Sequence, residues 1–139
     1  VPYLLQVAIG RLECVSIYGN DYPTRDGTGV RDYIHVMDLA EGHVAALRNI
    51  GAVEGVSTYN LGTGQGYSVL EIVKALSDIS SRNINYSFSP RRIGDVAECW
   101  SDSSLAARKL GWCAKKGLDE MLRDSWNWQN NNPDGYKSN

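Results

Sequence analysis

Two arginines placed near tyrosines and an aspartate are the residues of this chain best suited to bind a ligand. Arg31 follows a loop rich in glycine and aspartate, and Arg92 lies in a second loop together with Asp95. Two guanidinium forks can hold a diphosphate through paired hydrogen bonds. Tyr18 and Tyr33 offer a ring or a hydroxyl to a base or a sugar, and the Asp95 carboxylate can accept hydrogen bonds from sugar hydroxyls. These residue types therefore suit a nucleotide or sugar diphosphate.

The same charged residues also fit a simpler interpretation, in which they form ordinary surface ion pairs. Arg31 has Asp32 as its chain neighbour, and Arg92 has Asp95 within reach along the same loop. Such pairs are common on protein surfaces and contribute little to stability. Composition and spacing alone favour this interpretation over a ligand site.

A glycine-rich turn at residues 62–66 has the layout of a phosphate-binding loop, because it lies between an expected strand and an expected helix. The match to G-x-G-x-x-G is poor, since Tyr67 occupies the position of the third glycine. No acidic residue follows at the distance typical of ribose recognition. We therefore expect a tight turn rather than a dinucleotide site.

No group of residues has the spacing of a catalytic or metal centre. His35 and His43 have no Ser, Cys or Asp partner at a recognisable spacing, and His43 is expected in the core because it falls on an apolar helix face. The three cysteines are far apart and form no zinc-binding pattern. Trp100 is interpreted as a packing residue, with sugar stacking as the alternative. We assign no catalytic and no metal-binding residue.

Length and composition describe one ordinary globular domain. The chain has 139 residues, of which 42% are hydrophobic and 22% charged. Its net charge of −2 argues against a globally basic nucleic-acid binder. No apolar run approaches the ~20 residues that span a bilayer, and the first residues do not form a secretion signal. Unpaired, widely spaced cysteines are typical of a cytoplasmic protein. We therefore expect neither nucleic acid nor a membrane as a partner.

The pattern of apolar residues predicts alternating helices and strands. Helices are expected over residues 1–12, 36–49, 69–80 and 102–110 and from residue 118 onward. Strands are expected over residues 14–18, 30–35, 57–61 and 84–89. Ser68 and Glu71 have the spacing of a capping box. The polar residues 130–139 are expected to form a flexible tail. This order predicts an α/β or mixed α+β fold in one region, residues 1–139.

Four motifs of this chain occur together in one family of nucleotide-sugar enzymes. Residues 19–40 are GNDYPTRDGTGVRDYIHVMDLA, residues 59–64 are YNLGTG, and residues 90–95 are PRRIGD. The chain ends with W-x-W-Q and then NPDGY, which finishes at residue 136. In this order and spacing, the motifs closely resemble the UDP-glucose (UDP-galactose) 4-epimerase family of the extended short-chain dehydrogenase/reductases. RDYIH alone is shared more widely within that superfamily.

The resemblance implies a binding site for a UDP-hexose. Arg31 and Arg92 match arginines that hold the diphosphate, and Asp95 matches an acid near the ribose. The remaining positions that match the nucleotide pocket are Val15, Ser16, Ile17 and Tyr18, on the strand beside the uracil, and Tyr33, Val69, Ile93 and Gly94. For the two arginines, the resemblance reverses the preference and favours ligand binding over surface ion pairs.

The resemblance also implies which sugars are bound. Cys99 matches a position beside the hexose, where a bulky Tyr marks enzymes that resemble glucose and galactose specialists. A small residue leaves room for an N-acetyl group, which implies UDP-N-acetylglucosamine and UDP-N-acetylgalactosamine beside UDP-glucose and UDP-galactose. Ile93 replaces the Glu usual in this loop of the family. That replacement removes a charge beside Arg92, and we expect it to loosen the loop.

The motifs that carry catalysis in that family do not occur in these 139 residues. The G-x-x-G-x-x-G loop that holds NAD is absent, as is the Tyr-x-x-x-Lys pair that acts at the sugar C4. The first residue is Val rather than Met. We therefore expect the C-terminal, substrate-binding lobe of a longer epimerase, without its Rossmann lobe. NAD and the homodimer contacts would belong to the other half, and the isolated chain would be inactive and expose apolar surface along residues 30–49.

Two further functions fit the same residues. One is a free-standing module that binds a nucleotide sugar without catalysis. The other is a fragment of a related nucleotide-sugar dehydratase or decarboxylase. Turnover and product analysis would separate these functions from the epimerase.

Overall fold

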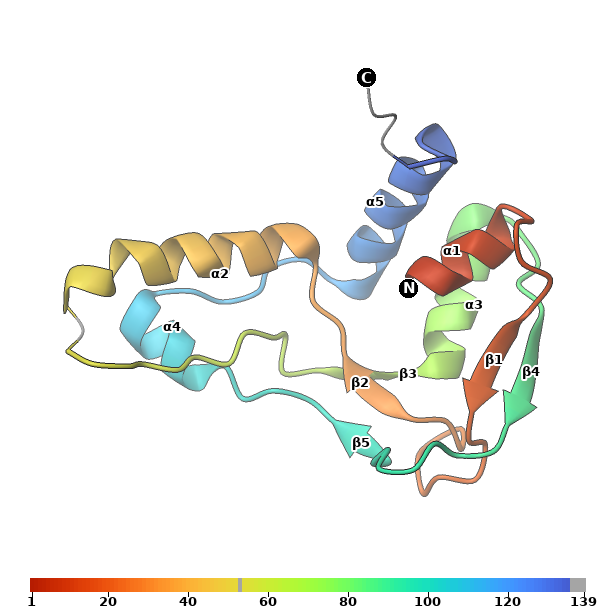
Figure 1. The fold of residues 1–139 in the computed structure, drawn as a ribbon, viewed down its shortest axis with the longest axis horizontal. Coiled ribbons are helices and arrows are strands. Elements are labelled where there is room, and N and C mark those ends of the chain that lie inside the picture. The colour runs from red at the N-terminus through yellow and green to blue at the C-terminus, as the bar shows by residue number, and fades with distance from the viewer. Residues whose placement is uncertain (53, 136–139) are drawn as a thin grey trace.

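The computed structural model describes residues 1–52 and 54–135 and shows a mixed α/β architecture (Figure 1). The helices are α1 (Pro2–Ala8), α2 (Val36–Arg48), the short 3₁₀ helix η1 (Ile50–Ala52), α3 (Val69–Ser80), α4 (Ser104–Leu110) and α5 (Leu118–Asn131). The strands are β1 (Val15–Tyr18), β2 (Val30–Asp32), β3 (Gly66–Ser68), β4 (Tyr86–Ser89) and β5 (Glu98–Cys99). The predicted fold class is confirmed.

The main core lies where α1, α3 and α5 meet the parallel strands β1 and β4 (Figure 1). Along β1, residues alternate between buried and exposed, so one face of the strand packs inward. The buried apolar cluster consists of Leu4, Leu5, Val7, Ala8, Val15, Ile17, Ile72, Val73, Leu76, Ile84 and Leu122. Burial of this cluster supplies the hydrophobic stabilisation of the lobe.

A second, three-stranded sheet has the order β3-β2-β5. β2 runs antiparallel to β3 and parallel to β5, and the register places Arg31 opposite both Tyr67 and Cys99. In Figure 1, β2 connects the core lobe to the part that contains α2 and α4. The central strand of this sheet therefore joins the two ends of the molecule.

The strand predicted over residues 57–61 is wrong, since the structure forms β3 at Gly66–Ser68 instead. Among the described residues, no strand pairs with the backbone of residues 57–61. Those residues run beside α4, where the Asn60 side-chain amide donates to the Asp102 carbonyl at 3.4 Å. Local β propensity failed here because a strand also needs a backbone partner. β5 escaped prediction because two residues are too few to show alternation.

The capping box predicted at the start of α3 is confirmed. The Ser68 hydroxyl accepts from the Glu71 amide at 3.1 Å, and the Glu71 carboxylate accepts from the Ser68 amide at 2.8 Å. The Ser68 hydroxyl also donates to the Asp26 carboxylate, which in turn accepts from the amide and hydroxyl of Thr28. The loop after β1 is thereby attached to the first turn of α3.

The C-terminal part of the chain follows the predicted helices with small shifts. α4 ends at Gly111, which has φ 64°, as expected for a helix stop by glycine. α5 continues through Asn131, so the first two residues of the predicted tail are helical. The remainder of that prediction, including the Tyr136 end of the family resemblance, falls partly outside the described residues.

One side of α2 packs against the segment between α4 and α5, and the other side is exposed. The Trp112 indole donates to the Asp38 carbonyl at 3.0 Å, and the Asp38 carboxylate accepts from the amides of Lys115 and Lys116. On the outer side, Val36, Met37, Val44 and Leu47 leave large apolar surface in solvent. This exposure fits the expectation for residues 30–49.

His43 is also on the exposed part of α2, so its predicted place in the core is wrong. Its Nδ1 lies 2.8 Å from the Leu39 carbonyl, which satisfies the ring locally. The apolar residues near it in sequence form an outward face, and periodicity cannot tell an outward apolar face from an inward one.

Among the described residues, no helix is long and apolar enough to cross a membrane.

A matched pair of leucines tests this division of buried and exposed surface. Leu76 is fully buried and Leu47 is 65% exposed. We expect Leu76→Ala to lower the free energy of unfolding by about 2–5 kcal/mol, because it leaves a cavity in the core. Leu47→Ala should change it by less than about 0.5 kcal/mol and should reduce self-association of the chain. Urea denaturation and light scattering measure both; equal destabilisation by the two variants would contradict this division.

The hydrogen bonds that Asp26 accepts from Ser68 and Thr28 predict that the fold loses stability in acid. Burial acts to raise the pKa of Asp26, but hydrogen bonds from Ser68 and Thr28 outweigh it and hold the pKa below its usual range. A carboxylate with a lowered pKa stabilises the fold above its unfolded pKa, near about 4, and that stability is lost as the pH falls through the folded pKa. The difference in urea midpoint between wild type and Asp26→Asn should therefore be large at pH 7 and vanish near about pH 2. The exposed Asp78→Asn is the control; a pH-independent difference for Asp26→Asn would refute the attachment.

Candidate functional site

Asp95 brings together the two arginines that the sequence marked as diphosphate ligands. Its Oδ2 lies 3.0 Å from Arg92 Nε, and its Oδ1 lies 3.8 Å from Arg31 Nη2. The sequence-based pairing of Arg92 with Asp95 is confirmed, whereas the pairing of Arg31 with Asp32 is wrong. Arg31 comes from β2 and Arg92 from the loop after β4, so two elements distant in sequence supply one cationic pair.

Arg31 is fixed in place by backbone groups as well as by Asp95. Its Nη1 donates to the Val30 carbonyl at 2.7 Å and to the Ala97 carbonyl at 3.4 Å. These bonds occupy one edge of the guanidinium. The opposite nitrogen faces Asp95, where an anion can approach it.

Tyr18 lies at the end of β1, directly beside Arg92. The Arg92 guanidinium carbon is 4.6 Å from the centre of the Tyr18 ring, which is a cation–π distance. Ser16 and Tyr18 face outward along β1, whereas Val15 and Ile17 are buried in the core. A ligand on this strand could therefore meet Val15 and Ile17 only through their backbone groups.

The loop that carries Arg92 is attached at its first arginine. Arg91 donates to the Asp21 carboxylate at 2.7 Å, and its guanidinium lies 4.1 Å from the centre of the Tyr22 ring. The hydrogen bond from Arg91 also holds the pKa of Asp21 below its usual range. Ile93 is fully exposed and Gly94 beside it is exposed as well, so neither side of this tip is packed. Sequence reasoning did not identify the Arg91–Asp21 attachment.

Tyr33 and Val69 lie at the border between the core and the site. Both are partly buried and pack against the core cluster. Burial raises the pKa of Tyr33, and the charge of Arg31 partly offsets that rise. The Val69 amide donates to the Gly29 carbonyl at 3.2 Å, which attaches α3 to the start of β2. Tyr33 is thus within electrostatic reach of Arg31, while Val69 acts on the site through the backbone.

A hollow of about 450 Å³ lies beside Arg31. Cys99 lines it together with Arg31, because the β2–β5 register sets these two residues opposite each other. Its other lining residues are Asp32, Ile34, Asn60, Leu61, Gly62, Trp100, Ser101 and Asp102. Of these, sequence reasoning considered only Trp100 for sugar contact. The signals for the rest were the motifs RDYIH and YNLGTG and the residues after Cys99.

The glycine-rich turn is not a free phosphate-binding loop. Backbone amides of Thr63 and Gly64 donate to the two carboxylate oxygens of Asp32, at 3.1 and 3.0 Å. A carboxylate of the chain itself therefore occupies the place where an anion would bind. Burial raises the pKa of Asp32, but its hydrogen bonds from Thr63, Ser101 and Gly64 outweigh burial and lower that pKa overall. The expected tight turn from a strand into a helix is wrong, because residues 57–61 form no strand and β3 lies between these glycines and α3.

In the described part of the chain, no group of three or more His, Cys, Asp or Glu side chains could hold a metal ion. His35 is buried, and its Nδ1 accepts from the Met37 amide at 3.0 Å as the N-cap of α2. Its Nε2 lies 3.1 Å from the Asp124 carboxylate of α5. These contacts make His35 a structural link between α2 and α5.

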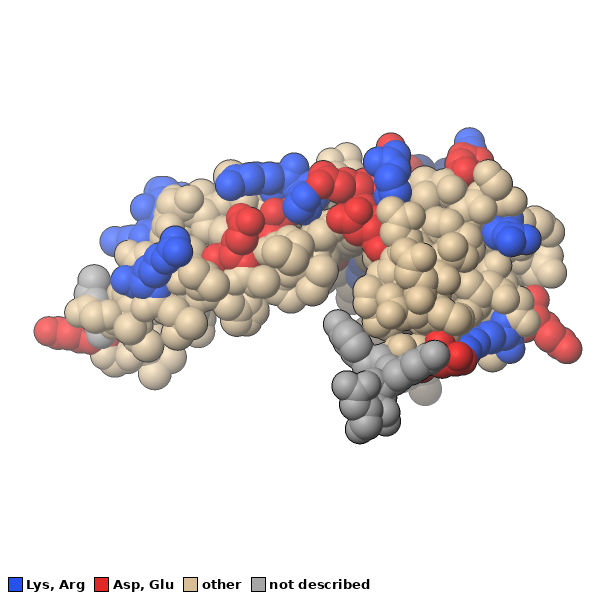
Figure 2. Space-filling view, turned by 90° about the horizontal axis from the view of Figure 1, so that it is seen from above, with Lys and Arg blue, Asp and Glu red and all other residues tan. Residues whose placement is uncertain are grey.

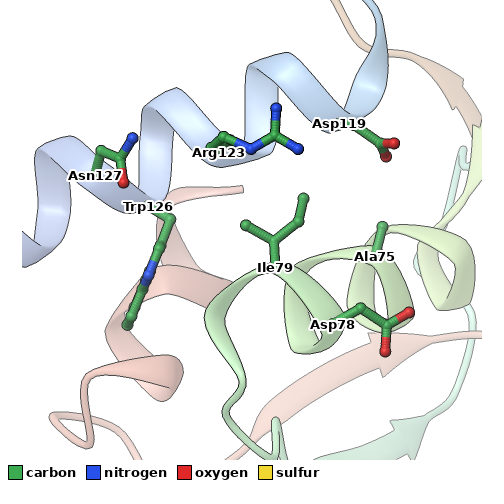
Figure 3. Close-up of a pocket in the computed structure, with 7 residues that line it drawn as sticks. All are labelled: Ala75, Asp78, Ile79, Asp119, Arg123, Trp126 and Asn127. Atoms are coloured by element: carbon green, nitrogen blue, oxygen red, sulfur yellow. The ribbon is translucent and has the colours of Figure 1, made fainter.

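A larger hollow, of about 640 Å³, lies between α3 and α5 and contains no residue assigned to the site. Figure 3 shows Asp119 and Arg123 on α5 facing Ala75 and Ile79 on α3 across it. Size alone does not identify a binding site, so the smaller hollow beside Arg31 is the better candidate. On the face shown in Figure 2, basic and acidic side chains lie in small groups separated by uncharged surface.

Comparison with known proteins agrees with this geometry. The family model described as GDP-mannose 4,6 dehydratase matches residues 1–125. Curated UDP-glucose 4-epimerases from Erwinia amylovora and Bacillus subtilis are 60% and 59% identical to this chain over 135 and 138 residues. The alignments cover 97% and 99% of this chain, which spans only 40% and 41% of the two relatives.

A solved structure gives the same result for the fold. UDP-glucose 4-epimerase from Bifidobacterium longum, in complex with NAD+ and UDP, is similar with a TM-score of 0.90 and 52% identity. The similarity covers 97% of this chain and 40% of that one. The chain therefore belongs to the GDP-mannose 4,6 dehydratase family, and its fold matches the C-terminal part of the UDP-glucose 4-epimerases to which it is similar.

Proposed function

We propose that this chain binds the UDP-hexose substrate of a UDP-glucose 4-epimerase. The observation that carries the proposal is the linear order of the site: Tyr18, then Arg92 and Arg31 around Asp95, then the hollow lined by Cys99. A nucleotide sugar has the same order of groups, with a base, a diphosphate and a hexose. The similar Bifidobacterium longum structure, which contains UDP, supports a nucleotide-sugar ligand.

Asp95 holds the place of the diphosphate until the ligand arrives. Its pair with Arg92 lies at the surface, with 64% of the Arg92 side chain exposed. Such a pair contributes about 0–1 kcal/mol, whereas a hydrogen bond from a charged donor to phosphate contributes about 1.5–3 kcal/mol. Phosphate oxygens therefore replace Asp95 at the guanidinium groups. The released carboxylate then accepts hydrogen bonds from the ribose hydroxyls.

The hexose lies in the hollow beyond Arg31. A mixture of polar groups and the indole of Trp100 lines this space, which suits a hydroxylated ring. The small Cys99 side chain leaves volume beside the ring for an N-acetyl group. Firm attachment of the diphosphate together with a roomy hexose site suits 4-epimerisation, in which the sugar must present both of its faces.

The glycine-rich turn does not fit the pyrophosphate of NAD. The backbone amides of the turn at residues 62–66 are engaged by Asp32, so that turn cannot hold a pyrophosphate. NAD supplies hydride transfer in an epimerase, and we propose that residues outside these 139 bind it and supply the acid–base pair. The chain's own part is to bind and orient the nucleotide sugar. A homodimeric parent enzyme and the use of N-acetylated sugars stay predictions.

Substitution of the two arginines tests the diphosphate site. We expect Arg31→Ala and Arg92→Ala each to weaken UDP binding by roughly 1–3 kcal/mol, because each removes a charge-assisted contact. The matched control is Arg48→Ala at the far end of α2, which should bind UDP like wild type. Isothermal titration calorimetry at two salt concentrations measures the effect, and binding should weaken as salt increases. Unchanged affinity for UDP in both site variants would show that Arg31 and Arg92 do not bind the diphosphate.

Conversion of UDP-galactose by the isolated chain distinguishes a substrate-binding lobe from a complete enzyme. The isolated chain should not convert UDP-galactose to UDP-glucose when NAD is added, and it should not bind NAD in equilibrium dialysis. UDP bound in the same dialysis serves as the positive control. Conversion above background would show that the catalytic groups lie within these 139 residues. Product analysis with the intact enzyme separates an epimerase from a dehydratase or decarboxylase.

A further inference from the structure

We propose that Asp32 is a positioning residue that sets the shape of the hexose hollow through the segments it holds. The inference rests on the proposed function, because it assigns the hexose to the hollow beside Arg31. Asp32 follows Arg31 in β2, and both residues line the hollow. The Asp32 carboxylate nevertheless accepts its hydrogen bonds from the surrounding walls, so it acts on the shape of the hollow through those walls.

The Asp32 carboxylate accepts five hydrogen bonds from two remote segments. Oδ1 accepts from the Thr63 hydroxyl at 2.6 Å and the Thr63 amide at 3.1 Å. Oδ2 accepts from the Gly64 amide at 3.0 Å and from the hydroxyl and amide of Ser101 at 2.9 and 3.3 Å. One carboxylate thus joins β2, the glycine-rich turn and the chain just after β5.

The glycine-rich turn and the chain after β5 form walls of the hollow, and each adjoins a short strand paired with β2. β3 pairs with β2 over three residues and β5 over two. Bonds from Asn60 to the Asp102 carbonyl and from Ser103 to the Gly62 carbonyl join the two remote walls to each other. Asp32 adds to these backbone ladders a side chain that bonds to both walls from the strand that carries Arg31.

The packing around this carboxylate explains the glycine at position 62. A Cβ atom there would lie 1.8 Å from the Ser101 hydroxyl and 2.4 Å from the Asp32 carboxylate. Any side chain at residue 62 would thus displace the same network. Gly62 and Asp32 act together on the distance between Arg31 and the wall formed by Cys99 and Ser101.

The test compares a ligand that fills the hollow with one that does not. UDP reaches only the arginines, whereas UDP-galactose also places a hexose in the hollow. In the 139-residue chain, Asp32→Asn should weaken UDP-galactose binding by about tenfold and change UDP binding by less than about twofold, by isothermal titration calorimetry. Asp78→Asn, an exposed aspartate of α3, is the matched control and should change neither affinity.

A second variant separates positioning from ligand contact and covers the case in which Asp32→Asn does not fold. Thr63 donates to Asp32 but does not line the hollow. Thr63→Ala should therefore give a smaller loss of the same kind, for UDP-galactose only. Equal weakening of both ligands in either folded variant overturns the positioning role, as does no weakening of UDP-galactose. Failure of the wild-type chain to bind UDP at all would instead overturn the proposed function.

Discussion

The central strand β2 carries a constraint on which the rest of the site depends: two neighbouring charged residues must each reach a different set of partners. Arg31 extends toward Asp95 and the hollow, while the Asp32 carboxylate accepts hydrogen bonds from the glycine-rich turn and from Ser101. A shift of one residue in register would move both side chains to the opposite face. The pairing of β2 with both β3 and β5 prevents that shift, and so it sets the place of the cation and the shape of the hollow together.

The two arginines of the free site share one carboxylate, which leaves this group of three residues with one net positive charge. Asp95 contacts two guanidinium groups at distances of 3.0 and 3.8 Å, so neither cation is left isolated. The pairs are partly exposed, which keeps the energy needed to separate them low. Under the proposed function, a diphosphate would exchange one anion for another at these preformed cations.

Short sequence patterns predicted most of the fold. The errors arose where the structure depends on contacts between residues that are far apart in the sequence. The capping box at Ser68 and the stop at Gly111 depend on a few adjacent residues, so both could be predicted. The false strand at residues 57–61 had the right composition but no partner, and the exposed His43 lies on an apolar face that points outward. For the site, the charged residues could be named from the sequence. Their geometry could not, because Asp95 and not Asp32 pairs with Arg31 across 64 positions of the chain.

The central claim is that the arginine pair recognises a diphosphate within a nucleotide sugar. A binding series with uridine, UMP, UDP and UDP-galactose on the wild-type chain tests it most directly, because each step adds one chemical group. The account predicts a rise in affinity at each phosphate, the larger part of it lost at high salt, and a further rise with the hexose. Uridine that binds as tightly as UDP would contradict the account, because Arg31 and Arg92 would then contribute nothing to recognition.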